Sequence, residues 1–345
     1  ALLEPTDEAA ALLPVEVPEA RSVVVLVLDG LGWNQLQARR PLAPTLASLV
    51  GGPVTTVAPS TTATALTSIV TGTAPGEHGV VGYRIDVDGE VLNALRWTTP
   101  RGDARQRIVP TEFQTRPAFL GHRPVVVQQA EFRGSGFTLA HLADVRNHGW
   151  YTMAGIVVEA RRAVAAGEPF VYAYYDGIDK TAHVHGFGEH YDAELAFVDR
   201  LVADTAASLP ADAALVVTAD HGQVHVGDAL IALGAQTCAL TAAVSGEPRF
   251  VWLHARSGRS AALEEAAADE HGDVAWVVPV AQVLDEGWFG RVVTRDAAAR
   301  LGDVALVARE PVALVHPARP GPLLQTRHGS LTPDEIEVPL AVALG

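Results

Sequence analysis

The sequence contains one cysteine, one lysine and one methionine. The single Cys238 excludes an intramolecular disulfide and a zinc site built from cysteines. Because Lys180 is the only lysine, a Walker P-loop or Schiff-base chemistry has almost no residue available to it. Any chemistry of this chain therefore has to come from other polar side chains.

Positive charge and long apolar runs are also scarce. The formal net charge of -15 argues against a nucleic-acid polymer or an anionic membrane as the main partner, although a small phosphorylated substrate remains compatible with it. Hydrophobic residues make up 48% of the 345 residues, yet no unbroken apolar run approaches the length of a membrane span. The run at 23–28 follows acidic residues rather than a basic stretch, so it does not resemble a signal peptide. We expect a globular cytoplasmic protein, and the sequence does not indicate its oligomeric state.

Strand-like and helix-like segments alternate along the chain. Near-continuous apolar runs predict strands that are buried on both faces, at 21–29, 169–179 and 214–222. Amphipathic or apolar periodic segments predict helices at 60–70, 151–166 and 191–208. This alternation predicts an α/β fold with a mostly parallel central sheet flanked by helices.

Two regions differ from this alternating pattern of strands and helices. Residues 83–97 contain an Asp88-Gly89 pair between apolar arms, which predicts a hairpin, and a short strand is expected at 125–128. Between 234 and 322 we expect a helix at 261–271 among short strands at "RFVWLHA", "VAWVVPV", "RVVT" and "VALVA". We therefore predict a core at 21–233 and 323–345, a hairpin and loop insertion at 84–149, and a smaller α+β cap-like insertion at 234–322.

Polar residues follow the predicted buried strands where each strand ends. Asp29 follows the first, Asp176 and Asp179 follow the second, and Asp220 and His221 follow the third. The carboxyl ends of parallel strands form the edge at which open α/β sheets bind ligands. We therefore expect these side chains to meet at one site.

Histidines add a metal-binding character to this set. Asp179 and His183 are four residues apart, so on a helix they share one face, and His328 lies in a glycine-flanked loop, "RHGS". Three carboxylates and three imidazoles suit Zn²⁺ or a similar divalent ion. Two such ions would hold the attacking and leaving oxygens of a displacement at phosphorus.

The segment "APSTTATALTSIVTG" at 58–72 places three hydroxyls directly before a predicted helix. A Ser or Thr there caps the free N–H groups of the first turn. A hydroxyl at the same place is also a candidate nucleophile, because a helix N-terminus favours negative charge. The local sequence leaves both interpretations open.

Five segments together resemble a known family. They are "VLVLDGLG", "APSTTATALTSIVTGTAPGEHGVVGY", "YYDGIDKTAHVHG", "VTADHGQVHV" and "RHGSLTPDEIEVPLAVA". In this order they resemble the alkaline phosphatase superfamily, and within it the type I phosphodiesterase/nucleotide pyrophosphatase branch. The resemblance leaves residues 84–150 and 234–322 largely uninterpreted.

The resemblance implies a two-metal hydrolase of phosphodiester or nucleotide pyrophosphate bonds that works through a covalent phospho-threonine. Thr62 would be the nucleophile, because in the family it precedes the Thr of the "TG" motif, here Thr71, by nine residues. Two ions, Zn²⁺ with Mn²⁺ as the alternative, would be bound by Asp29, Thr62, Asp220 and His221 and by Asp179, His183 and His328. Ser60 and Thr61 would shape or cap the turn.

Substrate contacts are only weakly indicated. Tyr83, Arg84 and Thr64 are candidates, while Ala65 stands where relatives acting on nucleotides often carry Asn. The expected partner is a small phosphate ester or anhydride.

Two other functions remain open. A phosphomonoesterase of the same superfamily would need extra positive charge, for which Arg84, Arg133 and Arg327 are available. An inactive metal-bound scaffold would bind metal without turnover. His185 and His225 are expected to support the site or to be exposed, rather than to bind a third metal.

Overall fold

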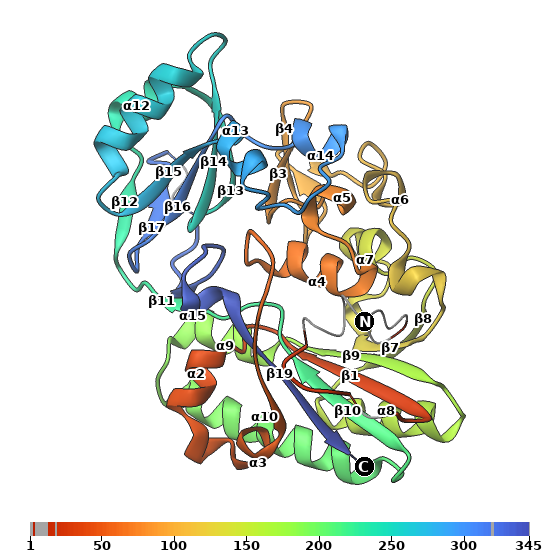
Figure 1. Ribbon diagram of the computed structural model, residues 1–345. Coiled ribbons are helices and arrows are strands. Elements are labelled where there is room, and N and C mark those ends of the chain that lie inside the picture. Colours follow the sequence, from red (N-terminus) through yellow and green to blue (C-terminus); the bar gives the residue numbers. More distant parts are fainter. Residues whose placement is uncertain (1–2, 4–12, 18, 319–320, 345) are drawn as a thin grey trace.

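The computed structural model describes residues 3, 13–17, 19–318 and 321–344. Its main feature is a seven-stranded sheet in the order β2-β19-β10-β1-β9-β7-β8 (Figure 1). These strands span Val50–Thr55 (β2), Glu337–Leu344 (β19), Ala213–Thr218 (β10), Ser22–Leu28 (β1), Phe170–Tyr175 (β9), Val125–Gln129 (β7) and Arg146–Trp150 (β8). The strands from β10 to β8 pair in parallel, and β19 runs antiparallel between β10 and β2. The predicted α/β fold with a mostly parallel sheet is confirmed.

Alternate residues of β1 face the two covered sides of this sheet, as the two-residue period of a strand requires. Val24 and Leu26 pack in the core with helices α2 (Trp33–Ala38), α3 (Pro44–Ser48), α8 (Ala154–Ala165), α9 (Gly177–His185) and α10 (Glu189–Ser208). Val25 and Val27 pack in the other core, with α4 (Thr62–Thr71) and α7 (Gly136–His141). Burial on both sides explains why the strand reads as an unbroken apolar run.

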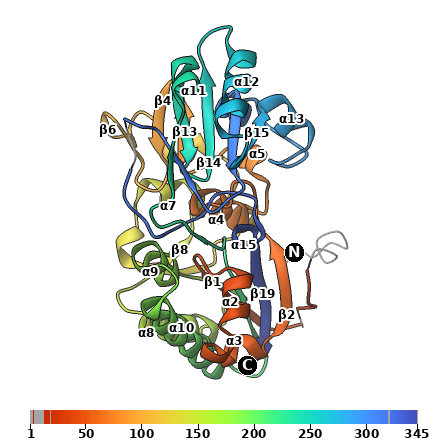
Figure 2. The same ribbon diagram turned by 90° about the vertical axis from the view of Figure 1, so that its left-hand side faces the viewer.

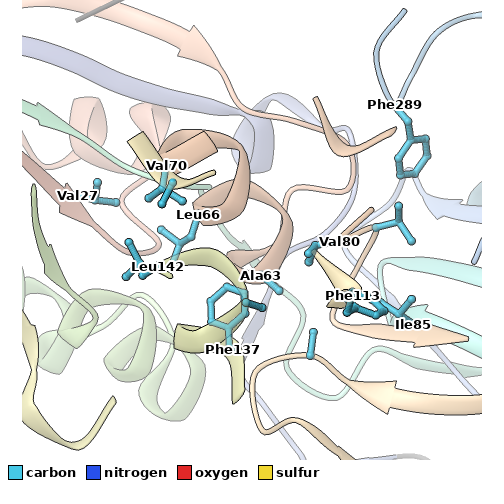
Figure 3. Packing of buried hydrophobic residues seen from close by; sticks show 14 of the residues in the cluster. Val27, Ala63, Leu66, Val70, Val80, Ile85, Phe113, Phe137, Leu142 and Phe289 are labelled. Carbon is cyan, nitrogen blue, oxygen red and sulfur yellow. The ribbon is translucent and has the colours of Figure 1, made fainter. Parts of the chain in front are cut away.

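Helix α4 carries the candidate nucleophile and is fixed by its apolar side. Ala63, Leu66 and Val70 are buried, and Figure 3 shows Leu66 and Val70 near Val27 of β1 and Leu142. The helix begins at Thr62 and ends before Gly72, whose φ of 68° is the left-handed conformation that commonly ends helices. Its first turn is therefore held in a fixed position.

Smaller antiparallel sheets lie beyond α4, in the upper half of Figure 1. One has the order β13-β14-β16-β15, with β13 (Thr241–Glu247), β14 (Phe250–Ala255), β16 (Val304–Ala308) and β15 (Ala275–Pro279), and helix α12 (Ser260–His271) packs on it. The other comprises β3 (Arg84–Val87), β4 (Glu90–Asn93), β5 (Thr98–Thr99) and β6 (Gly102–Asp103). The expected hairpin is present, turning at Asp88 and Gly89, which both have positive φ.

The remaining described strands and α-helices are short. They are the two-stranded pairs β11 (Val224–His225) with β18 (Thr326–Arg327) and β12 (Leu230–Ala232) with β17 (Ala313–Val315), and helices α5 (Pro75–His78), α6 (Pro110–Phe113), α11 (Ala235–Leu240), α13 (Val280–Asp285), α14 (Arg295–Ala299) and α15 (Pro333–Ile336). Figure 2 shows α15 beside β19, near the end of the large sheet closest to the smaller ones. Among the described helices, none combines the length and apolar character needed to cross a bilayer.

Two expectations need correction. The segment "RVVT" is not a strand, because Thr294 instead accepts a hydrogen bond from the Ala297 N–H and caps α14, leaving Val292 exposed. The region 84–149 is more than a hairpin with loops, because β7 and most of β8 lie in it and belong to the central sheet. The rest of the proposed division, a core with a cap-like insertion at 234–322, stays a prediction.

A buried ion pair joins the turn between β13 and β14 to helix α15, which follows the His328 motif. Arg249 donates from Nε and Nη2 to the two carboxylate oxygens of Glu335, each at 2.7 Å, and both side chains are fully buried. Glu335 also accepts from the Ser330 N–H at 3.0 Å. The pair therefore holds the chain directly after His328.

Replacing Arg249 by methionine should destabilise the protein, because Glu335 would stay buried without its cation. We expect a loss of roughly 3–5 kcal/mol in the free energy of unfolding. Chemical denaturation of R249M measures it. The exposed pair of Arg200 and Asp204 offers a control, since R200M should cost less than about 1 kcal/mol. Equal losses in the two variants would contradict this role of the buried pair.

Candidate active site

Three polar side chains converge where β1 and β10 end. Asp29 directly follows β1, and Asp220 and His221 follow β10. Potential ligand atoms of these three residues all lie within 4.8 Å of one another. His221 Nε2 is 3.4 Å from both Asp29 Oδ1 and Asp220 Oδ2. The parallel strands thus bring together residues that are about 190 positions apart in sequence.

A second group lies beside the first and shares His221 with it. Ligand atoms of Asp179, His221 and His328 are also within 4.8 Å of one another. Asp179 and His183 lie on helix α9, as predicted, and His183 Nε2 is 3.3 Å from Asp179 Oδ1. The structure therefore places the six predicted aspartate and histidine ligands close together. Their division between two ions stays a prediction.

The three histidines are oriented alike. The Nδ1 atoms of His183, His221 and His328 lie 2.8, 3.0 and 3.0 Å from backbone carbonyl oxygens. Since a carbonyl only accepts, Nδ1 carries the proton in each neutral ring and Nε2 keeps its lone pair. The Nε2 atoms are the ones that face the aspartates. This orientation is typical of metal-binding histidines.

Two of the clustered aspartates have buried carboxylate oxygens without a hydrogen-bond partner among the described residues, and a cation would stabilise them. Asp29 Oδ1 and Asp220 Oδ2 have no hydrogen-bond partner among the described residues. Burial raises the pKa of the Asp29 carboxyl well above its usual range and raises the pKa of Asp220 and Asp179 as well. Burial also lowers the pKa of His221, which keeps its ring neutral. Divalent ions would neutralise the clustered carboxylates and accept the free lone pairs, so these residues fit a metal site.

The remaining carboxylate oxygens are held by the protein. Tyr174 donates its hydroxyl proton to Asp29 Oδ2, and Asp220 Oδ1 accepts from the Gly30 and His221 N–H groups at 3.1 and 3.0 Å. Gln223 Nε2 donates to Asp179 Oδ1 at 2.9 Å. These bonds fix the direction in which the free oxygens point.

Thr62 is the first residue of α4 and adjoins the first group. Its Oγ1 lies 3.0 Å from His221 Nε2. Ser60 plays a different part, because its Oγ donates to the Ser330 carbonyl at 2.6 Å and accepts from the Gly329 N–H at 3.2 Å. Thr61 occupies the N-cap position, but its side chain makes no capping bond. The three hydroxyls therefore differ in role, and only Thr62 contacts a predicted ligand through its side chain.

A cavity of about 780 Å³ opens over Thr62 and is bounded by both small sheets. Among the predicted substrate contacts, Tyr83 and Arg84 line it, and so does Arg327. Thr64 does not line it and is fully buried within α4. Arg133 is exposed and lies away from the cavity.

The two additional histidines lie outside the ligand groups. His185 stacks on His190 with ring centroids 3.9 Å apart, and His225 is exposed. Within the described residues neither belongs to a group of three potential ligands. The expectation that neither binds a third metal stays a prediction.

Sequence reasoning missed Gln223 and Glu247. Gln223 directly follows the "DHG" motif, so its place in the sequence was an available signal. Glu247 ends β13, lines the cavity and accepts from the Tyr83 N–H at 2.9 Å. No local pattern marks Glu247, because its burial arises from packing between segments far apart in the chain.

Glu247 should make stability depend on pH. Burial raises its pKa from 4.5 to about 8, so the folded protein holds this proton longer than the unfolded chain. Stability therefore falls as pH rises from 4.5 to about 8. Between about pH 5 and pH 9, the free energy of unfolding should fall less in E247Q than in the wild type. The difference between the two losses should be at most about 5 kcal/mol. Thermal denaturation across this range measures it, with E265Q at an exposed position as the control. Parallel curves for E247Q and the wild type would contradict it.

Comparisons with known proteins identify the family of the chain. The sequence profile of the type I phosphodiesterase/nucleotide pyrophosphatase family matches residues 23–331. None of the curated protein sequences compared with the chain matches it.

Solved structures share the fold. Murine ectonucleotide pyrophosphatase/phosphodiesterase 5 is 16% identical with a TM-score of 0.69, and the match covers 93% of this chain and 87% of that chain. Its inactive variant, solved in complex with AMP, is 15% identical with a TM-score of 0.70 and the same coverage. Phosphonoacetate hydrolase from Sinorhizobium meliloti, in complex with phosphonoacetate, is 19% identical with a TM-score of 0.66, over 94% of this chain and 90% of that chain. Because the family profile spans most of the sequence, the chain belongs to the type I phosphodiesterase/nucleotide pyrophosphatase family of phosphoester-hydrolysing enzymes.

Proposed function

We propose that this protein is a two-metal hydrolase of phosphodiester or phosphoanhydride bonds with Thr62 as its nucleophile. The observation that carries the proposal is the position of Thr62 Oγ1, 3.0 Å from His221 Nε2, at the first residue of α4 and in the wall of the cavity. The family is metal-dependent, and the ligand set suits Zn²⁺, with Mn²⁺ as the alternative.

The ligand residues would form two sets. Asp29, Asp220 and His221 would hold one ion near Thr62, and Asp179, His183 and His328 would hold the other. When bound, such ions supply Lewis-acid stabilisation of the charge that develops on the phosphoryl oxygens.

The protein's own steps start from Thr62. As its hydroxyl loses a proton, Oγ forms a bond to phosphorus while the bond to the leaving oxygen breaks, and that oxygen takes up a proton. Free N–H groups at the start of α4 favour the negative phosphoryl group there. Water then hydrolyses the phospho-threonine and returns Thr62 to its starting state.

Two alternatives have a specific basis. The arginines at the cavity would suit the extra charge of a phosphomonoester, and a metal-bound scaffold would lack turnover altogether. The test compares hydrolysis of bis-p-nitrophenyl phosphate and p-nitrophenyl phosphate by the zinc-loaded protein. Preference for the diester supports the proposal, preference for the monoester favours the phosphomonoesterase, and turnover of neither favours the scaffold.

A further inference from the structure

Arg84 and Arg327 line the same cavity as Thr62 and have no anionic partner in the described part of the chain. Other arginines, such as Arg146 and Arg249, form ion pairs with glutamates. Although the net charge of the protein is -15, these two guanidinium groups place positive charge beside the candidate active site.

Arg327 is held so that part of its hydrogen-bonding capacity is unused. The side chain is buried, and its Nη2 donates to the Pro322 carbonyl at 2.7 Å. Its Nε is buried and has no partner among the described residues. Burial without an acceptor costs free energy, which an anion at this position would recover.

The two arginines reach the same short segment of the chain. A Cβ added at Gly321 would lie 3.9 Å from Arg84 Nη2, and Arg327 Nη2 donates to the carbonyl of the next residue, Pro322. Arg84 begins β3 and Arg327 ends β18, so the fold brings like charges together from separate elements. Such a pairing is unfavourable unless a negative group lies near both.

Glu247, a carboxyl group close to Arg84, does not supply that negative charge at neutral pH. Glu247 lies near enough to Arg84 to feel its charge, but burial raises the pKa of Glu247 to about 8. Its Oε2 already accepts from the Tyr83 N–H. The positive charge of the two arginines is therefore largely uncompensated at the cavity.

The cavity offers room for more than a phosphoryl group. Its volume of about 780 Å³ is in the range of sites that hold whole small molecules. The described cavity wall includes the aliphatic side chains of Val91, Leu95, Val244, Leu314 and Leu324 among polar ones, and Tyr83 is its only Phe, Tyr or Trp residue. A substrate with an aliphatic arm fits this lining better than one that needs two aromatic rings around a base.

We propose that Arg84 and Arg327 form a subsite for a second anionic group of the substrate, a carboxylate or a phosphate carried on an arm of the phosphoryl group that reacts at Thr62. The inference rests on the proposed function, because it places that phosphoryl group at Thr62. Guanidinium groups suit both anions, since their N–H donors match two oxygens at once.

Binding of unreactive phosphonates to the zinc-loaded protein tests the subsite directly. The matched pair is 3-phosphonopropionate and 3-phosphonopropanamide, which differ only in the charge of the far group. Isothermal titration calorimetry should show roughly tenfold or tighter binding of the carboxylate. Ethane-1,2-diphosphonate provides the phosphate-like arm, and the tighter of the two anionic ligands identifies which anion the subsite prefers.

Two variants and one control assign the effect to these residues. R84Q and R327Q should each reduce the carboxylate preference to about threefold or less, with carboxamide affinity unchanged within about twofold. R133Q, at an exposed position away from the cavity, should keep the wild-type ratio. Arg327 is adjacent to His328. If R327Q therefore loses zinc or does not fold, the binding ratio of R84Q, on the hairpin, decides whether the subsite exists.

The outcomes separate the two proposals. Equal affinities of the carboxylate and the carboxamide for the wild type, or a preference that survives in R84Q, would overturn the subsite. Because the phosphonates only bind, this result does not depend on turnover. Failure to hydrolyse bis-p-nitrophenyl phosphate would instead count against the proposed function and leave the binding ratio as the measure of the subsite.

Discussion

T62A should lower kcat/KM for a phosphodiester by roughly 10³-fold or more while the protein keeps its metal. The reason is that Thr62 Oγ1 is the only one of the three neighbouring hydroxyls within hydrogen-bond distance of a predicted ligand side chain. Removing it takes away the group that would form the covalent bond to phosphorus. The measurement is steady-state hydrolysis of bis-p-nitrophenyl phosphate together with metal analysis of the same sample.

Thr61 provides the matched control for this prediction. It also lines the cavity and differs from Thr62 by one position, but its side chain makes no capping bond. T61A should retain activity within a few-fold. Acid quenching followed by mass spectrometry should find a p-nitrophenyl phosphoryl group on Thr62 in the wild type and none in T62A. Wild-type turnover by T62A, or loss of activity only in T61A, would refute the assignment.

D220N should release metal from the protein. Asp220 Oδ2 is buried without a partner among the described residues, so it is the oxygen available to a cation. Replacing the carboxylate removes one negative charge and one strong ligand. Loss of an outer hydrogen-bond partner already costs about 10–100-fold in metal affinity, and loss of a direct ligand should cost at least as much. Zinc titration with a competing chelator measures the change.

Asp176 supplies the control for this second prediction. It also follows a buried strand and is itself buried, but its Oδ2 is paired with Lys180 Nζ at 2.6 Å. It belongs to neither group of potential ligands. D176N should therefore keep its zinc. Unchanged zinc affinity in D220N would contradict the ligand assignment, and equal losses in both variants would show a general effect of charge.

Strands β1, β7, β9 and β10 of the central sheet could be predicted because they carry local signals, whereas no strand was predicted at β2, β8 or β19. The runs that became β1, β9 and β10 are apolar at nearly every position and lead into aspartate, and both properties follow from their position in a covered parallel sheet. Likewise, the four-residue spacing of Asp179 and His183 depends only on helix geometry. These predictions needed no knowledge of distant contacts.

Other features depend on contacts between distant segments and were beyond sequence reasoning. The burial of Glu247 requires the meeting of β13, the segment at Tyr83 and the loop at Gly329, where an added Cβ would lie 2.6 Å from Glu247 Cγ. The bridge from Ser60 to Gly329 and Ser330 spans about 270 positions. Conversely, "RVVT" has strand-like composition but no partner strand in the described structure, which is why that prediction was wrong.

The position of β19 has a consequence for biosynthesis. This strand lies between β10 and β2, and within the described sheet β2 pairs with no other strand. During translation, β2 must therefore wait for a segment made almost 300 residues later, while the β10 edge remains open to pairing with other chains. The Ser60 loop must wait in the same way for Gly329. We expect the nascent chain to depend on chaperones until β19 leaves the ribosome, and the loop at Ser60 to meet Gly329 only shortly before that.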